Sequence, residues 1–109
     1  MKAIITIAIS LLIAVPISVR AADAKANWDN NCAQCHGKNG AADTKMGKAL
    51  NAKDLTDSKV QAAFSDAKAT ESIKNGVKEG GKTTMKAFGG KLTDDEIKAL
   101  VAYVRTLKK

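Results

Sequence analysis

Cys32-Ala33-Gln34-Cys35-His36 is the stretch that decides the fold, because it holds both cysteines and the single histidine of the chain. Two thiols at this spacing can add across the two vinyl groups of one porphyrin. The residue that follows can supply a ring nitrogen to the iron. A Cys-x-x-Cys-His run is the attachment signature of a c-type haem. The sequence therefore predicts one covalently bound haem c, with thioethers at Cys32 and Cys35 and the proximal iron ligand at His36.

Three other kinds of site use similar residues. A redox-active dithiol has the same cysteine spacing, but it belongs to a thioredoxin-like βαβ unit, whereas the pattern here is helical. A structural zinc site usually takes four side-chain ligands, and this chain offers two cysteines and one histidine. A plain disulfide between Cys32 and Cys35 stays open, because exported proteins form disulfides freely.

The first residues of the chain predict export. Lys2 precedes an apolar run that Pro16 interrupts, and small residues before Ala22 offer a cleavage site. This order is typical of a secretory signal peptide. We expect residues 1–21 to be a signal peptide and residues 22–109 to be one domain in the periplasm or an equivalent lumenal compartment. An uncleaved anchor is the alternative, although the run is shorter than the ~20 residues that span a bilayer.

The pattern after the signal peptide is helical, and no segment alternates like a strand. The clearest helix follows Thr93, which forms a capping box with Glu96, while Leu92 and Ile97 have the spacing of a hydrophobic staple. Its apolar stripe continues to Leu107. Three earlier helices are expected at Ala22–Ala33, Asp57–Ala67 and Thr70–Lys78, with loops at Gly37–Asn51 and Glu79–Lys91.

The domain has few large side chains with which to build a core. Its aromatic residues are Trp28, Phe64, Phe88 and Tyr103. A buried porphyrin would supply a large apolar surface for the helices to pack against. The sequence thus predicts an all-α domain of about four helices around one haem, and we expect the chain without haem to be poorly folded.

Methionine is the natural second iron ligand, because its soft sulfur binds haem iron. Met85 lies in the segment before the last helix, where the chain can fold over the face of the porphyrin opposite His36. Met46 follows His36 so closely that little chain remains to pass round the haem edge. We therefore predict Met85 as the sixth ligand and Met46 as a packing residue.

Nearly the whole chain after the signal peptide resembles the small monohaem class I cytochromes c of bacteria. Beside the haem motif, Met85-Lys86-Ala87-Phe88 resembles the family's Met-Pro-Ala-Phe ligand loop, and Leu92 to Val104 resembles its closing helix. Ala24 and Trp28 stand where the family packs a small residue and an aromatic against that helix. The resemblance implies the class I cytochrome c fold, with iron held between a histidine and a methionine.

Two lysines depart from the family pattern. Lys48, in Gly47-Lys48-Ala49-Leu50, replaces the proline whose carbonyl accepts a hydrogen bond from the proximal histidine, and Lys86 replaces the proline after the methionine. A backbone carbonyl remains at residue 48 and can still orient His36. Because lysine leaves the chain more freedom than proline does, we expect a more labile Met85–iron bond than in relatives with both prolines.

Two axial side-chain ligands make the iron six-coordinate, so no position is open to oxygen, peroxide or substrate. Such an iron passes single electrons, and a thioether ligand raises its potential. We expect an electron-transfer protein rather than an enzyme, namely a soluble exported carrier. Two alternative functions stay open. One is a haem domain or subunit of a larger periplasmic oxidoreductase, and the other is a gas-binding or catalytic haem protein. The residues expected to wall the haem pocket are Leu50, Ile73, Val77, Phe88, Leu100 and Val104.

The chain is basic, with 18 Lys and Arg against 11 Asp and Glu and a formal net charge of +7. Such a charge could steer acidic redox donors and acceptors into short-lived encounters. An ordinary solvated lysine surface is the alternative. We expect a monomer without stable membrane insertion, and no nucleic-acid partner, because no binding motif is present. The lysines expected around the haem edge are Lys38, Lys48, Lys82, Lys86 and Lys91.

Overall fold

The computed structural model describes residues 3, 8–13 and 21–109. Most of the predicted signal peptide, residues 1–21, lies outside the described residues. Residues 8–13 have no regular secondary structure and are exposed. Within the described part of the chain, no helix is long and apolar enough to cross a membrane.

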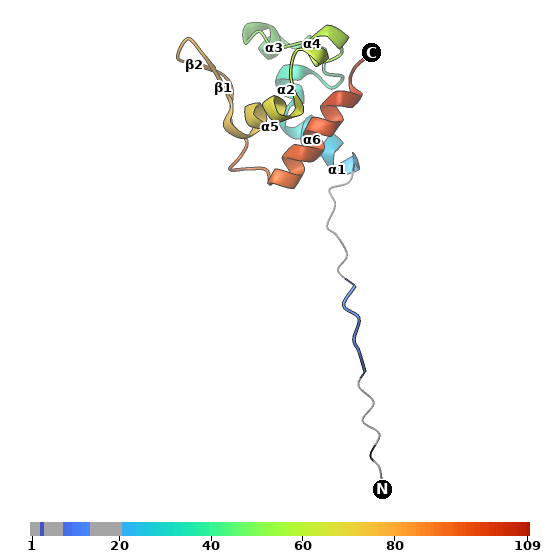
Figure 1. The fold of residues 1–109 in the computed structure, drawn as a ribbon. Helices are drawn as coiled ribbons and strands as arrows, with labels where there is room; N and C mark the ends of the chain where they lie inside the picture. The colour runs from blue at the N-terminus through green and yellow to red at the C-terminus, as the bar shows by residue number, and fades with distance from the viewer. Residues whose placement is uncertain (1–2, 4–7, 14–20) are drawn as a thin grey trace.

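The folded part consists of helices around a central helix pair, with one small hairpin (Figure 1). Helices α1 and α5 both pack against α6. The hairpin projects from the end of α5, away from the α1–α6 pair (Figure 1). The elements in chain order are α1 Ala21–Asn31, α2 Ala33–His36, α3 Lys45–Ala49, α4 Ser58–Ala62, α5 Asp66–Asn75, β1 Val77–Glu79, β2 Lys82–Met85 and α6 Asp94–Thr106.

Helix α6 begins as its sequence predicts. The hydroxyl of Thr93 accepts a hydrogen bond from the backbone amide of Glu96 at 3.1 Å. The Glu96 carboxylate accepts one from the backbone amide of Thr93 at 3.0 Å. The capping box is therefore confirmed. Leu92 and Ile97, the expected staple pair, are both buried in the same cluster. The largest fully buried side chains of the described residues are Trp28, Ile97 and Leu100, where α1 meets α6.

The two middle helices have different bounds from those expected. The segment Asp57–Ala67 is not one helix, because α4 ends at Ala62 and the Ser65 hydroxyl starts α5 by accepting the amide of Lys68 at 3.0 Å. Helix α5 thus begins before the expected Thr70–Lys78 segment. It ends at Asn75, because Gly76 turns the chain with a φ of 78°.

The expectation that no segment is a strand is wrong. Strands β1 and β2 pair antiparallel inside the segments expected to be helix and loop, with Val77 opposite Met85. Gly80 and Gly81 connect them, both with positive φ, as a tight hairpin turn requires. The other expected loop, Gly37–Asn51, contains the short helix α3. The described domain is thus mostly helical rather than purely helical.

The capping box gives a pH-dependent contribution to stability. Hydrogen bonds from the Thr93 amide, and then from the Asn27 side chain, hold the pKa of Glu96 below its ordinary value. A lowered carboxylate pKa stabilises the fold above the unfolded-state pKa, and this contribution is lost as the pH falls through the folded-state value. We expect Glu96→Gln to lower the unfolding midpoint near pH ~7 by more than it does near pH ~3. Thermal melts at both pH values test this, and a constant difference would contradict it.

Candidate haem-binding site

The haem motif lies where α1 runs into α2. Cys32 is buried in the turn between the two helices, and Cys35 and His36 belong to α2. Both thiols are free in the structure, which therefore has no disulfide between Cys32 and Cys35. Burial, and then the neighbouring Cys35, raise the pKa of the Cys32 thiol to about 11. Two free thiols on one helical turn beside a histidine fit the chemistry of a covalent haem.

His36 is partly buried. Burial lowers the pKa of the imidazole, and the backbone of Lys53 raises it by a smaller amount. A neutral imidazole is the form that binds metal. The Nδ1 atom is buried and has no hydrogen-bond partner among the described residues. The bond to the carbonyl of Lys48 that the sequence allows is not formed among the described residues, and that carbonyl accepts a hydrogen bond from the amide of Asn51 at 3.4 Å.

Trp28 holds the chain that follows the motif. Its indole nitrogen donates to the carbonyls of Gly37 and Lys38, at 3.1 Å and 3.2 Å. Its ring packs against the rings of His36 and Tyr103, with centroid distances of 5.7 Å and 5.6 Å. The resemblance places Trp28 against the last helix, and its contact with Tyr103 of α6 confirms that placement.

Thr44 is a residue of this site that the sequence analysis does not single out. Its hydroxyl donates to the carbonyl of Cys35 at 2.6 Å and accepts the amide of Gly47 at 2.9 Å, so it joins α3 to α2. Gly47 lets the two helices approach, because a Cβ there would collide with the same Cys35 carbonyl. The signal that could have found Thr44 is its preference for the first position of a helix.

The two candidate methionines have different surroundings. Met85 ends β2 and packs, partly buried, against the core cluster that contains Cys32. A bulge precedes it, since Val77 pairs with Met85 and Lys78 with Thr83. Such a bulge re-aims the side chains beside it. Met46 lies on α3 with 43% of its surface exposed. Of the two, Met85 is the one that the structure brings to the core.

The six residues predicted for the wall of the haem pocket fall into two groups in the structure. Leu50 and Val77 are half-buried and lie outside the core cluster. The cluster does contain the four other residues expected in the wall, with Cys32 and Trp28 among their neighbours: Ile73, Phe88, Leu100 and Val104. The five lysines expected around the haem edge are all exposed, and the Lys86 ammonium lies 5.4 Å from the centre of the Phe88 ring.

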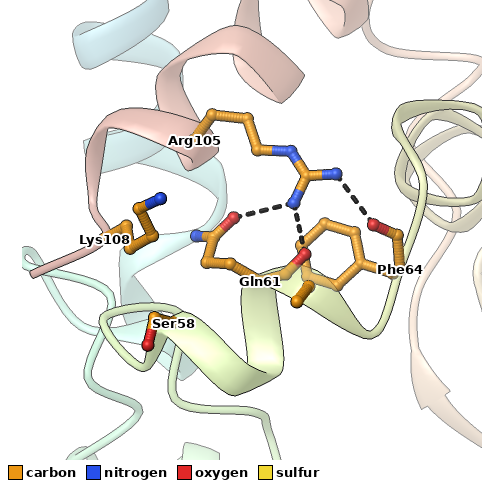
Figure 2. Close-up of a pocket in the computed structure, with 6 residues that line it drawn as sticks. Ser58, Gln61, Phe64, Arg105 and Lys108 are labelled. Atoms are coloured by element: carbon orange, nitrogen blue, oxygen red, sulfur yellow. Dashed lines mark hydrogen bonds between the residues drawn. The ribbon is translucent and has the colours of Figure 1, made fainter.

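A surface hollow of about 440 Å³ lies elsewhere, between α4 and the end of α6 (Figure 2). None of the residues predicted for the haem site lines it. Figure 2 shows Arg105 donating to both oxygens of Gln61, at 2.6 Å and 2.9 Å, and to the carbonyl of Phe64 at 2.8 Å. The side-chain nitrogen Nε2 of Gln61 donates in turn to the carbonyls of Leu55 and Val104. All of these polar side-chain groups form hydrogen bonds within the protein. Together the bonds form a clamp between α4 and α6.

We expect Arg105→Lys to weaken the fold by about 1–3 kcal/mol, because lysine cannot donate to the acceptors of Gln61 and Phe64 together. Asp66→Asn is the matched control. Asp66 accepts from the same guanidinium at 2.8 Å, but it is well exposed and should contribute less than about 1 kcal/mol. Denaturant unfolding measures both, and equal effects would contradict the assignment of stability to the Gln61 side of the clamp.

Comparison with known proteins places this geometry in a family. The profile of the family described as cytochrome c oxidase, cbb3-type, subunit III matches residues 19–104. The chain belongs to this family. The cbb3-type cytochrome c oxidase subunit FixP of Azorhizobium caulinodans is 40% identical over 77 residues, which are 71% of this chain and 24% of FixP. The chain therefore spans about a quarter of the length of that relative.

Solved structures of c-type cytochromes have the same fold. The KustC0563 c-type cytochrome matches with a TM-score of 0.71 and 37% identity, over 79% of this chain and 98% of its own. A point mutant of Kustc0563 matches with a TM-score of 0.69 and 37% identity, over 79% of this chain and 99% of its own. Together with the family match, these likenesses confirm a small class I cytochrome c that carries covalently bound haem c with iron.

Proposed function

We propose that this cytochrome transfers single electrons through a haem whose iron is bound by His36 and Met85, with thioether bonds to Cys32 and Cys35. The observation that supports this ligand set is the packing of Met85 against the cluster that contains Cys32, while Met46 stays exposed. Haem c supplies a metal that changes oxidation state by one electron. The protein's part is to hold that metal in one coordination state in both oxidation states.

Each of these residues has a separate task in that proposal. The two cysteines fix the porphyrin to α2, so its position does not depend on the iron bonds. His36 and Met85 would both bind the iron, and with both side chains bound no position would remain for oxygen or other ligands. The thioether of Met85 and the apolar side chains of Ile73 and Phe88 favour the reduced iron, because both disfavour extra positive charge.

Our lead proposal for its place in the cell is a soluble exported carrier. The likeness to the KustC0563 c-type cytochrome covers 98% of that chain, so the matched region makes up almost all of that solved chain. The apolar run after Lys2 supports export to the periplasm. The exposed lysines favour brief encounters with acidic redox donors and acceptors.

A second candidate is a component of a larger oxidase. The family description and the likeness to FixP, a cbb3-type oxidase subunit, both favour it. In that role the domain would pass electrons within a stable complex. The haem chemistry is the same in the two cases, and the difference lies in how long the partner stays bound.

Fractionation of the source cells separates the two candidates. A carrier should appear in the soluble exported fraction as a monomer, and its electron transfer to an isolated oxidase should rise with cytochrome concentration and weaken as salt increases. An oxidase component should remain with the solubilised membrane complex in a fixed ratio. Recovery only in such a complex would contradict the carrier proposal.

A further inference from the structure

The segment that carries Met85 lies against the end of α5. The amide of Phe88 donates to the carbonyl of Ile73 at 2.8 Å, and the amide of Gly89 donates to the carbonyl of Lys74 at 3.0 Å. These carbonyls belong to the last turn of the helix, where no further helical amide follows to bond them. The loop after Met85 therefore completes the end of α5 and is held by it.

Gly76 lies directly under this segment. A Cβ at Gly76 would lie 2.6 Å from the carbonyl oxygen of Met85, 3.0 Å from the amide nitrogen of Ala87 and 3.2 Å from the carbonyl carbon of Lys86. All three atoms belong to the backbone, so no side chain can swing aside to make room. The residue also has a φ of 78°, which side chains rarely allow. The chain from Met85 to Ala87 can therefore follow this path only because residue 76 is a glycine and has no side chain.

Gly89 makes a second contact of the same kind. A Cβ there would lie 2.8 Å from the carbonyl oxygen of Lys74, the atom to which Gly89 itself donates. Unlike Gly76, Gly89 does not have a positive φ. The residue is therefore needed for space alone. The two glycines hold the segment on both sides of Phe88, whose ring is buried in the core.

We propose that Gly76 and Gly89 are positioning residues for the sixth iron ligand. By letting the Met85 segment close on the last turn of α5, they set where the Met85 sulfur lies. This inference rests on the proposed ligation by Met85. Lys86 does not restrict its own backbone as a proline would, so close contact with α5 fixes the segment instead.

Four alanine variants separate contact from backbone strain. Gly76→Ala introduces both, and Gly89→Ala introduces a collision without positive φ. Gly81→Ala has the same φ of 78° as Gly76 but nothing within 4 Å, and Gly90→Ala has neither feature. Each holo-protein is compared with wild type by the near-infrared sulfur-to-iron band, by the rate of carbon monoxide binding to reduced haem and by the thermal unfolding midpoint.

We expect the Gly76 and Gly89 variants to lose intensity in the sulfur band and to bind carbon monoxide about tenfold faster, since crowding a packed site displaces its groups. The Gly81 and Gly90 variants should keep the band and stay within about twofold of wild type. A purely structural role for the glycines would lower the unfolding midpoint without moving the band or the rate. If Gly76→Ala does not fold, Gly89→Ala decides, because it adds no backbone strain.

Two results would overturn the inference while leaving Met85 as the ligand. One is an unchanged band and carbon monoxide rate in Gly89→Ala and in any folded Gly76→Ala. The other is an equal change in Gly81→Ala, which would assign the effect to backbone strain. A wild-type protein without the sulfur band would instead contradict ligation by Met85, and the inference with it. The wild-type spectrum therefore distinguishes failure of the proposed function from failure of this proposal.

Discussion

Met85→Ala should leave the iron, which we propose to be six-coordinate, either five-coordinate or bound by water. Alanine has no atom that can bind iron, and the side chain it replaces is the methionine that packs against the core. We expect the sulfur-to-iron band to disappear and carbon monoxide to bind readily. The reduction potential should fall by on the order of 0.2 V, a fraction of the ~0.8 V over which axial ligands tune haem iron. Spectra, gas binding and a potentiometric titration measure these effects.

Met46→Ala is the matched control for this prediction, because it removes the same side chain from an exposed position on α3. It should leave the spectrum, the carbon monoxide response and the potential as they are in wild type. An unchanged Met85→Ala spectrum would contradict our ligand assignment. Loss of the band in Met46→Ala would assign the sixth ligand to Met46 instead.

Trp28→Ala should cause a large loss of stability. Trp28 is 2% exposed and packs against His36 and Tyr103. Truncating a buried aromatic of this size costs about 3–5 kcal/mol, and here it also leaves the carbonyls of Gly37 and Lys38 without their indole donor. We expect the unfolding midpoint of the holo-protein to fall by more than about 10 °C.

Trp28→Phe separates the two parts of that effect. Phenylalanine keeps an aromatic ring between α1 and α6 but cannot donate to the two carbonyls. Its cost should be about 1–3 kcal/mol, clearly less than that of alanine. Chemical unfolding of both variants gives the comparison. A Trp28→Ala protein within about 1 kcal/mol of wild type would contradict the account of the α1–α6 contact as the centre of the fold.

Features that depend on neighbours in sequence are predictable from the chain alone. The haem motif is one of them, because Cys32, Cys35 and His36 act within a single helical turn. The start of α6 is another, because Thr93 and Glu96 bond to each other. In both cases the residues that interact are a few positions apart, and the spacing itself carries the information.

The sequence analysis does not predict the hairpin of β1 and β2, although the sequence contains a turn signal for it. Gly80 and Gly81 are a typical pair for a two-residue turn, but the flanking strands are short, rich in lysine and threonine and mostly exposed. They therefore lack the apolar alternation by which strands are recognised. Val77, expected in the pocket wall as a helix residue, lies in β1 and outside the core cluster instead.

Other differences arise from residues far apart in the chain. The break between α4 and α5 is held by Arg105, which donates to the carbonyls of Gln61 and Phe64 across more than 40 positions. The contacts under Met85 likewise depend on where α5 ends relative to a later segment. Local patterns contain neither relation, so propensity alone could not place the boundary of α4 or single out Gly76.

The visible and near-infrared spectrum of the oxidised and reduced holo-protein, with and without carbon monoxide, tests the central claim most directly. Iron bound by His36 and Met85 predicts a sulfur-to-iron band in the oxidised protein and little response to carbon monoxide in the reduced protein. Absence of the band together with rapid carbon monoxide binding would mean an open iron. That result would contradict single-electron transfer as the function and favour a gas-binding or catalytic haem protein.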